Sequence, residues 1–150
     1  MESRLSWDEY FAEIANVTSK RSCDKRLKVG TVLVKDNRIV STGYNGNCSG
    51  VPNDQTMMVD GHDVLKVHSE VNAICNAAKF GVNISGSVCY VTHFPCINCA
   101  KSLIASGISK IHYINSYKDS QAVTDLCQIT NTPLIKLNAL SVSPSVKTEF

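Results

Sequence analysis

Apolar residues near the start of the chain recur at the spacing of an amphipathic helix. Ser6 and Glu9 stand three residues apart, as the N-cap and the third helical residue do in a capping box. The apolar positions that follow are Tyr10, Phe11, Ile14 and Val17. This pattern predicts a first helix that begins at the capping box and ends at about Lys20.

Two runs rich in β-branched residues come next, from Lys28 to Val34 and from Arg38 to Thr42, with Lys-Asp-Asn between them. Such a pair of runs predicts a β-hairpin. The stretch from Gly43 to about Val67 contains four glycines and one proline and has little periodicity. We expect a long loop there, and a loop of that length in a compact domain is usually functional.

The rest of the chain alternates helical with strand patterns. Helices are expected from His68 to Lys79, from about Pro95 to Gly107 and from Asp119 to Ile129, and strands from Ser87 to Thr92, from Ile108 to Ile114 and from Leu134 to Leu137. A helix between successive strands implies a right-handed crossover and parallel neighbours. The predicted fold class is therefore α/β, a three-layer α/β/α sandwich around a five-stranded mixed sheet.

The length and composition fit one globular domain. A chain of 150 residues with 43% hydrophobic and 19% charged residues is typical of a soluble protein. We expect residues 1–137 to form the domain and residues 138–150, with three serines and one proline, to form a C-terminal tail or a strap across a neighbouring molecule. No apolar run is long enough to span a bilayer, and the start lacks a signal-peptide pattern, so a cytoplasmic protein without a membrane partner is expected.

The net charge of +2 argues against stable binding of nucleic acid. Five of the lysines and arginines nevertheless fall between Lys20 and Lys28. That cluster fits a solvated helix end, where cations complement the C-terminal dipole, and it fits equally an edge of the domain that faces a phosphate.

The seven cysteines call for an explanation, because a chain without an export signal does not need disulfides. Metal ligation, catalysis and burial are the remaining uses. Cys75 and Cys127 lie at apolar positions of predicted helices and Cys89 lies within a predicted strand, so all three are expected in the core. The roles of Cys23 and Cys48 stay open.

Two short motifs stand at the starts of consecutive predicted helices, His68-Ser69-Glu70 and Pro95-Cys96-Ile97-Asn98-Cys99. The three N and S ligands His68, Cys96 and Cys99 suit one catalytic Zn²⁺ with an open position for water. Glu70 lies close enough to act as a base toward that water. A redox dithiol at Cys96 and Cys99 and a structural zinc site are the competing interpretations.

These motifs resemble the signature of the zinc-dependent nucleobase deaminases, His-x-Glu followed by Pro-Cys-x-x-Cys. Further blocks are similar to the deoxycytidylate (dCMP) deaminase branch of the cytidine/deoxycytidylate deaminase family, and the similarity spans roughly residues 5 to 137. These blocks are residues 6–11, 29–36, 68–74 and 99–108, together with Gly43-Tyr44-Asn45-Gly46.

The resemblance implies a cytidine-deaminase-like fold and hydrolytic deamination of dCMP to dUMP and ammonia, on the route to dTMP. In that reaction Glu70 takes a proton from water and delivers protons to N3 and to the leaving amine. The resemblance also suggests that the amide of Asn45 binds the sugar hydroxyl and that Tyr117 closes over the nucleotide. Arg26 and Lys28 are candidates for the phosphate by charge alone.

Purely structural interpretations of the same residues stay open: Asn45 also suits an Asn-Gly turn, and Tyr117 also suits an ordinary loop. His93, two residues before Pro95, lies where it could line the site or simply belong to a loop. His112 alternates with apolar neighbours in a predicted strand, which indicates a structural role.

Relatives with the motif formed by Gly43, Tyr44, Asn45 and Gly46 are commonly homohexamers that dCTP activates and dTTP inhibits, with the effector pocket near this motif. The resemblance therefore implies allosteric regulation, with Mg²⁺ accompanying a triphosphate effector. The chain departs from the family pattern at Cys48, where a proline is expected nearby, and at Ser69, where alanine is commoner. Cys48 and His62 would be the ligands available for a second metal on the loop.

Other assignments of function use the same residues. A bifunctional dCMP/dCTP deaminase, or another cytosine nucleotide deaminase, keeps the fold and changes the substrate. Free cytidine is disfavoured because the predicted helix from Asp119 to Ile129 makes the last two strands parallel, and a tRNA substrate is disfavoured by the small net charge. A non-enzymatic zinc protein or a Cys-x-x-Cys redox protein is the alternative from a different class.

Overall fold

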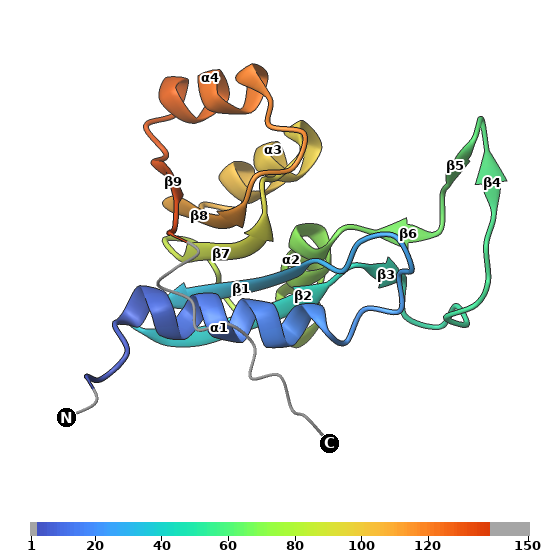
Figure 1. Cartoon of the computed structure of the whole chain (residues 1–150), viewed down its shortest axis with the longest axis horizontal. Helices are drawn as coiled ribbons and strands as arrows, with labels where there is room; N and C mark the ends of the chain where they lie inside the picture. Colours follow the sequence, from blue (N-terminus) through green and yellow to red (C-terminus); the bar gives the residue numbers. More distant parts are fainter. Residues whose placement is uncertain (1–2, 139–150) are drawn as a thin grey trace.

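The computed structural model describes residues 3–138, and it places a mixed sheet between layers of helices (Figure 1). The helices are α1 (Trp7–Ser19), α2 (Ser69–Phe80), α3 (Ile97–Ala105) and α4 (Gln121–Ile129). The strands of the main sheet are β1 (Gly30–Lys35), β2 (Arg38–Tyr44), β7 (Val88–His93), β8 (Lys110–Asn115) and β9 (Leu134–Lys136). The predicted three-layer α/β fold with a five-stranded mixed sheet is confirmed.

The strand order is β2-β1-β7-β8-β9. β1 is antiparallel to both β2 and β7, whereas β7, β8 and β9 are parallel. The expectation that the last two strands are parallel is confirmed. The crossover through α2 connects β2 to β7, and these two strands are not neighbours in the sheet. The hairpin leaves the second edge of β1 free, and β7 pairs with that edge. β2 and β7 are therefore parallel to each other with β1 between them.

The two faces of the sheet carry separate apolar cores, because side chains alternate along a strand. Val32 and Val34 of β1 pack with Phe11 and Ala15 of α1 on one face. On the other face, the core that reaches α2, α3 and α4 is built from Leu33, Ala73, Ala77, Cys89, Val91, Leu103, Ile111, Val123 and Cys127. The ends of α2 and α3 that carry the two motifs thus belong to the same layer.

Two glycines allow helices to approach the hairpin closely. A Cβ on Gly30 would overlap the backbone of Ala15 and Ser19 in α1. A Cβ on Gly43 would overlap the backbone of Ser69 and Ala73 in α2. Gly43 therefore lets β2 lie directly against the first turns of α2, where the motif with His68 and Glu70 begins.

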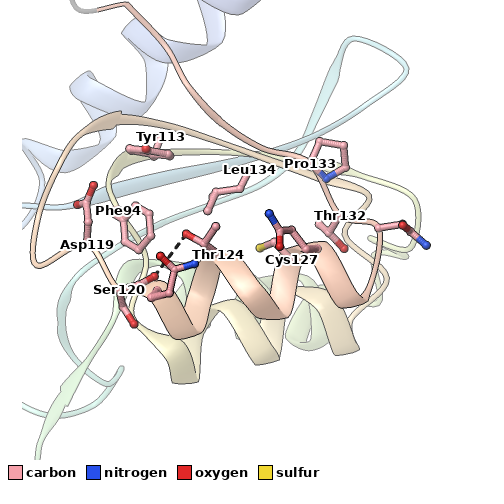
Figure 2. Close-up of a pocket in the computed structure, with 12 residues that line it drawn as sticks. Phe94, Tyr113, Asp119, Ser120, Thr124, Cys127, Thr132, Pro133 and Leu134 are labelled. Carbon is pink, nitrogen blue, oxygen red and sulfur yellow. Dashed lines mark hydrogen bonds between the residues drawn. The ribbon is translucent and has the colours of Figure 1, made fainter.

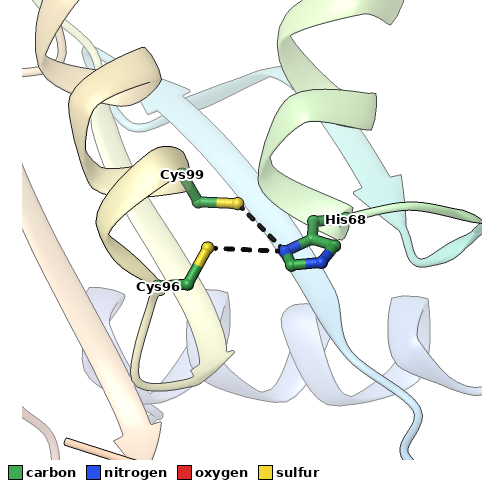
Figure 3. A group of neighbouring side chains, drawn as sticks. All are labelled: His68, Cys96 and Cys99. Atoms are coloured by element: carbon green, nitrogen blue, oxygen red, sulfur yellow. Dashed lines mark hydrogen bonds between the residues drawn. The ribbon is translucent and has the colours of Figure 1, made fainter. Parts of the chain in front are cut away.

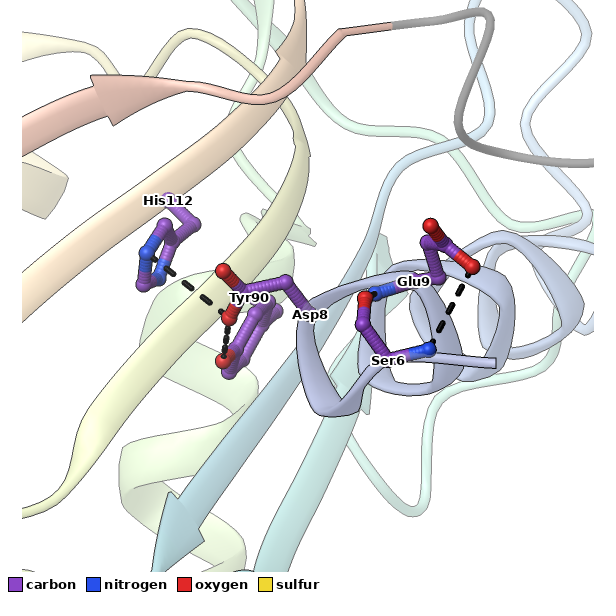
Figure 4. A network of polar contacts seen from close by, with 5 residues as sticks. All are labelled: Ser6, Asp8, Glu9, Tyr90 and His112. Atoms are coloured by element: carbon purple, nitrogen blue, oxygen red, sulfur yellow. Dashed lines mark hydrogen bonds and ion pairs between the residues drawn. The ribbon is translucent and has the colours of Figure 1, made fainter. Parts of the chain in front are cut away.

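The predicted capping box at the start of α1 is confirmed. The Ser6 hydroxyl accepts from the backbone N–H of Glu9 at 3.1 Å, and the Glu9 carboxylate accepts from the backbone N–H of Ser6 at 3.3 Å. The first turn of α1 also brings Asp8 to Tyr90 and His112 (Figure 4). The aromatic rings of Tyr90 and His112 stack with centroids 4.6 Å apart, which agrees with a structural role for His112.

Cys75 is exposed, so its predicted core position was wrong, whereas Cys89 and Cys127 are buried as expected. The buried face of α2 is formed instead by Ser69, Glu70, Ala73 and Ala77. Small alanines face the sheet because α2 approaches β2 so closely, and this rotates Cys75 toward solvent. In α4, Val123 and Cys127 are buried, whereas Ile129 at the end of the helix is 79% exposed.

The stretch predicted as a long loop contains four two-residue strands. β3 (Gly46–Asn47) pairs with β6 (Lys66–Val67), and β4 (Met58–Val59) pairs with β5 (His62–Asp63) in a hairpin that projects from the body (Figure 1). Strands of two residues are too short to show a period of two in the sequence.

Three further expectations concern the start of α3, the tail and membrane-spanning helices. Pro95 precedes α3 instead of opening it, because Cys96 is the N-cap and the helix begins at Ile97. Of the predicted tail, residues 139–150 lie outside the described residues. Within the described part of the chain, no helix has both the length and the apolar character needed to cross a membrane.

Candidate active site

The side chains of His68, Cys96 and Cys99 meet where α2 and α3 begin (Figure 3). Nδ1 of His68 lies 3.5 Å from Sγ of Cys96 and 3.3 Å from Sγ of Cys99. The sequence separates this histidine from the cysteines by 28 and 31 residues, and the fold brings them together because α2 and α3 lie in the same layer.

The donor set fits a zinc ion. With Zn–N near 2.1 Å and Zn–S near 2.3 Å, tetrahedral ligands would place nitrogen and sulfur about 3.6 Å apart. The separations of 3.5 Å and 3.3 Å lie close to that value. One imidazole and two thiols make three protein ligands, the number that leaves one position for water or substrate in catalytic zinc sites. Among residues 3–138, this is the one group of three metal-binding side chains close enough to share an ion.

Helix ends shape the electrostatics of the cluster. His68 is the N-cap of α2 and Cys96 is the N-cap of α3, and neither side chain makes a capping hydrogen bond. The partial positive charge at the N-terminus of a helix favours thiolates. Hydrogen bonding from Cys99 and then from His68 lowers the pKa of the Cys96 thiol to about 3. The contact with Cys96, together with burial, raises the pKa of Cys99.

Glu70 is the buried carboxylate of the site, with only 4% of its surface exposed. Burial raises its pKa, although hydrogen bonds from Ser69, from the backbone and from Cys99 oppose this shift. A carboxyl whose pKa lies nearer to neutrality both accepts and donates a proton readily at physiological pH. The arrangement places a group suited to proton transfer beside the donor set.

The cluster opens into a pocket of about 580 Å³. Of the residues predicted to bind the nucleotide, Asn45, Arg26 and Tyr117 line this pocket together with His68, Glu70 and Cys96, whereas Lys28 does not. His93 and His62 also line it. Within the proposed effector motif, only Asn45 reaches the pocket; Gly43, Tyr44 and Gly46 are not among its lining residues.

Several lining residues carry no motif in the sequence, namely Asp24, Leu27, Phe94 and Lys118. Lys118 follows Tyr117 directly, so a basic residue beside the predicted aromatic was the available signal for it. Long-range hydrogen bonds with Asn45 hold the segment that contains Asp24 and Leu27, and no local pattern encodes them.

Asn45 ties that segment to β2. Its amide oxygen accepts from the backbone N–H of Val29, and its amide nitrogen donates to the carbonyl of Leu27, both at 2.8 Å. The carboxylate of Asp24 accepts from the backbone N–H of Arg26 at 2.8 Å and so closes a tight turn. Asn45 therefore shapes the wall of the pocket that carries Arg26.

His93, Tyr117 and Lys118 add aromatic and cationic side chains to the lining of the pocket. The ring of Tyr117 lies edge to face with His93 at 6.0 Å, and the ammonium group of Lys118 lies 5.3 Å from the centre of the Tyr117 ring. The carboxylate of Asp119 holds the loop by accepting from the backbone N–H of Tyr117 at 2.7 Å. Burial lowers the pKa of His93, so its imidazole is neutral at physiological pH.

A second pocket, of about 790 Å³, lies between α4 and the end of the sheet (Figure 2). Phe94 lines both pockets, but no member of the His68, Cys96 and Cys99 group reaches the second one. The larger volume thus lies away from the metal-binding side chains, and the chemistry points to the smaller pocket.

Helices that begin at an imidazole and at paired thiols, with a buried carboxylate beside them, define the zinc-deaminase class of α/β proteins. Residues 5–115 match the family model of the cytidine and deoxycytidylate deaminase zinc-binding region. The chain belongs to this family.

Curated relatives agree with this placement. ComE operon protein 2 of Bacillus subtilis (strain 168) is 41% identical over 118 residues, which cover 77% of this chain and 62% of that protein. The chain thus spans less than two thirds of the length of that relative. The deoxycytidylate deaminase of Mycobacterium phage D29 is 38% identical over 125 residues, which cover 74% of this chain and 96% of that enzyme.

Among solved structures, the dCMP deaminase from the cyanophage S-TIM5 in complex with dCMP and dUMP has a TM-score of 0.79 and 31% sequence identity. The match covers 91% of this chain and 100% of that chain. The similarity therefore extends over most of the chain, and it is not restricted to the residues around the donor set.

Proposed function

We propose that this chain catalyses the hydrolytic deamination of dCMP to dUMP and ammonia. The observation that carries the proposal is the buried carboxylate of Glu70 beside the donor set of His68, Cys96 and Cys99. The cationic side chains of Arg26 and Lys118 line the same pocket. The structural similarity to an enzyme that was solved with dCMP and dUMP supports the same substrate class.

His68, Cys96 and Cys99 would hold the zinc ion. A zinc ion bound by three protein ligands supplies a Lewis acid that lowers the pKa of water toward 7. The thiols contribute negative charge, and the hydrogen bonds that lower the pKa of Cys96 favour its thiolate form.

Glu70 handles the protons. Its carboxylate accepts one proton from the attacking water and delivers it to N3. It then accepts the second proton of that water, from the new hydroxyl on C4 of cytosine, and delivers it to the amino group. The oxygen of water replaces nitrogen at C4, ammonia leaves, and uracil remains. The raised pKa of Glu70 suits this exchange, because the same group must be a base first and an acid afterwards.

Other residues that line the pocket fit a nucleoside monophosphate. Arg26 and Lys118 place cationic groups at the pocket, and we assign them to the phosphate in preference to Lys28, which does not line it. The amide of Asn45 makes one donor and one acceptor bond to the backbone, which leaves one N–H and one lone pair for a sugar hydroxyl. Tyr117 offers a ring over the nucleotide.

The decisive experiment measures ammonia release by the zinc-loaded chain from dCMP, dCTP and cytidine. We expect the highest kcat/KM with dCMP. Comparable rates with dCTP would instead indicate the bifunctional enzyme. Absence of product from all three nucleotides would overturn the proposal and would favour a non-catalytic zinc protein or a dithiol redox protein, which zinc analysis and thiol titration distinguish.

Regulation and assembly belong to the same proposal. We infer a cytoplasmic homohexamer that dCTP, with Mg²⁺, activates and dTTP inhibits, on the strength of the family motif at residues 43–46. The close packing of Gly43 against Ser69 and Ala73 offers a route by which a shift near the motif reaches the first turns of α2. Initial rates with and without each triphosphate test the regulation, and light scattering tests the subunit number.

A further inference from the structure

A row of three polar side chains runs from the sheet to the carboxylate of Glu70. The Ser69 hydroxyl lies 2.6 Å from Oε1 of Glu70, and the Thr31 hydroxyl in β1 lies 2.8 Å from the Ser69 hydroxyl. Thr31 and Ser69 are fully buried, and Glu70 is 4% exposed. The row therefore joins the carboxylate to the central sheet through buried side chains.

The direction of the hydrogen bonds follows from the chemistry of the groups. A carboxylate only accepts, so Ser69 donates its single hydroxyl proton to Glu70. The oxygen of Ser69 can then only accept in its contact with Thr31, so Thr31 is the donor there. Both hydroxyl protons point toward Glu70, and each step supports the charge on the carboxylate.

Helix capping, which is the usual structural role of a serine at the start of a helix, does not account for Ser69. The N-cap of α2 is His68, and Ser69 lies inside the helix with its hydroxyl directed to Glu70. Burying a hydroxyl is costly unless it is hydrogen-bonded. Thr31 belongs to β1, which pairs with strands on both sides, so the far end of the row is fixed to an interior strand of the sheet.

We propose that Ser69, supported by Thr31, is a positioning residue that fixes the carboxylate of Glu70 through Oε1 and leaves Oε2 for proton transfer. This inference rests on the proposed function, because it concerns the orientation of the group that moves protons. Catalytic side chains must be held within about 0.5 Å of the productive geometry, and such precision requires supporting hydrogen bonds.

Two variants test the row. Ser69→Ala removes the donor to Glu70, and we expect kcat to fall about tenfold, the factor expected for losing a hydrogen bond to a charged group. KM for dCMP should change less than about twofold, because the Ser69 hydroxyl contacts Glu70 and Thr31 and neither cation that we assign to the phosphate. Thr31→Val keeps the shape and should reduce kcat by a smaller factor, whereas Thr31→Ser should retain the wild-type kcat.

The double variant tests whether the two hydroxyls act in sequence. Thr31 acts on Glu70 only through Ser69, so adding Thr31→Val to Ser69→Ala should lower kcat no further. A multiplicative loss would show that the residues act separately and would overturn the role of Thr31. Because the row is buried, a double-mutant cycle of unfolding free energies on the zinc-loaded chain measures the coupling of Thr31 and Ser69 without reference to activity.

Ser41→Ala is the matched control. The Ser41 hydroxyl is also buried and donates to the carbonyl of Ala73 in α2 at 2.6 Å, but it does not contact Glu70. We expect this variant to lower stability and leave kcat unchanged. If Ser41→Ala lowers kcat as much as Ser69→Ala, the loss of kcat reflects a general disturbance of the packing, and the inference fails.

The outcomes separate the two proposals. Wild-type activity on dCMP with an unchanged kcat in Ser69→Ala overturns this inference and leaves the proposed function standing. A wild-type chain that releases no ammonia overturns the proposed function and the inference with it. Zinc content, measured for every variant, must equal that of the wild type for a change in kcat to count as support.

Discussion

The phenol of Tyr90 in β7 donates a 2.6 Å hydrogen bond to Oδ1 of Asp8 in the first turn of α1. Tyr90 is 5% exposed, and its pKa is raised by burial and by the contact with Asp8, so the hydroxyl keeps its proton at physiological pH. The bond ties the outer helix of one layer to a central strand, on the face of the sheet opposite the cluster of His68 and the two cysteines.

Tyr90→Phe should therefore destabilise the fold without changing the chemistry. Removing a hydrogen bond to a charged group costs about 1.5–3 kcal/mol, and we expect the lower end because Asp8 is half exposed and regains water. Urea unfolding at pH 7 measures the loss. Tyr10→Phe, at a tyrosine that is 43% exposed, is the control and should change the free energy of unfolding little.

His112 makes the stability depend on pH. Burial lowers its pKa, Asp8 opposes this shift, and Lys110 adds to it. The 4.0 Å contact with Asp8 is therefore made by a neutral imidazole at physiological pH. In the unfolded chain the pKa is near 6.5, so the unfolded state binds more protons below that pH and the folded state loses stability as the pH falls.

The corresponding variant is His112→Phe. It preserves a ring against Tyr90 and removes the titrating group, and Nδ1 of His112 has no hydrogen-bond partner within residues 3–138. We expect the melting temperature of the wild type to fall between pH 7 and pH 5 by more than that of the variant. His62→Phe, at an exposed histidine, should keep the wild-type dependence. Equal slopes for His112→Phe and the wild type would contradict the assignment.

Glu70→Gln should abolish turnover while zinc remains bound. The amide is nearly isosteric with the carboxyl but cannot accept the proton of water, and general acid–base catalysis contributes about 10²–10⁴-fold to the rate. Ammonia release and zinc content are the two measurements. Glu13→Gln, on α1 beyond the other face of the sheet, provides the matched change and should keep full activity. Near-normal turnover by Glu70→Gln would remove the carboxylate from the mechanism.

Zinc binding should depend on Cys96 and Cys99 and not on the other cysteines of the chain. Cys96→Ser and Cys99→Ser replace a soft thiolate by a hydroxyl, so we expect loss of zinc and of activity, as on treatment with a chelator. Cys75→Ser, at an exposed position of α2, should retain one zinc per chain. If either site variant kept zinc at wild-type affinity, the donor set would be wrongly assigned.

The glycines of the motif at residues 43–46 should respond differently to a methyl group. Gly43→Ala forces a Cβ into the backbone of Ser69 and Ala73, so we expect a loss of stability of about 1–3 kcal/mol and reduced activity as the first turns of α2 shift. Gly46→Ala meets no atom within 4 Å and should resemble the wild type in both respects. Thermal unfolding and kcat for dCMP make the comparison.

Much of this architecture is visible in the sequence because it is encoded locally. The capping box of Ser6 and Glu9 specifies where α1 begins, and the β-branched runs specify the hairpin that follows. The donor set is also predictable, since His68 and the two cysteines stand in short motifs with fixed spacing. Each of these signals lies within a few residues of the structure that it specifies.

Features that depend on long-range packing could not be predicted. The exposure of Cys75 follows from the close contact of α2 with β2 at Gly43, which rotates the helix so that alanines face the sheet. Asp24 lines the pocket in a segment that Asn45, 21 residues further on, holds by accepting from Val29 and donating to Leu27. The separation of β2 from β7 arises because β1 has two edges to pair, which the order of elements does not reveal.

The two helices that carry the site both start at residues that a protein designer would replace. His68 and Cys96 occupy N-cap positions without a capping hydrogen bond, and serine, threonine, aspartate or asparagine at an N-cap stabilises a protein by typically about 1 kcal/mol. Stability screens of the metal-free chain would thus favour substitutions at both proposed ligands. Selecting variants of this protein for thermostability alone would lead away from its chemistry, so such screens need zinc retention as a second criterion.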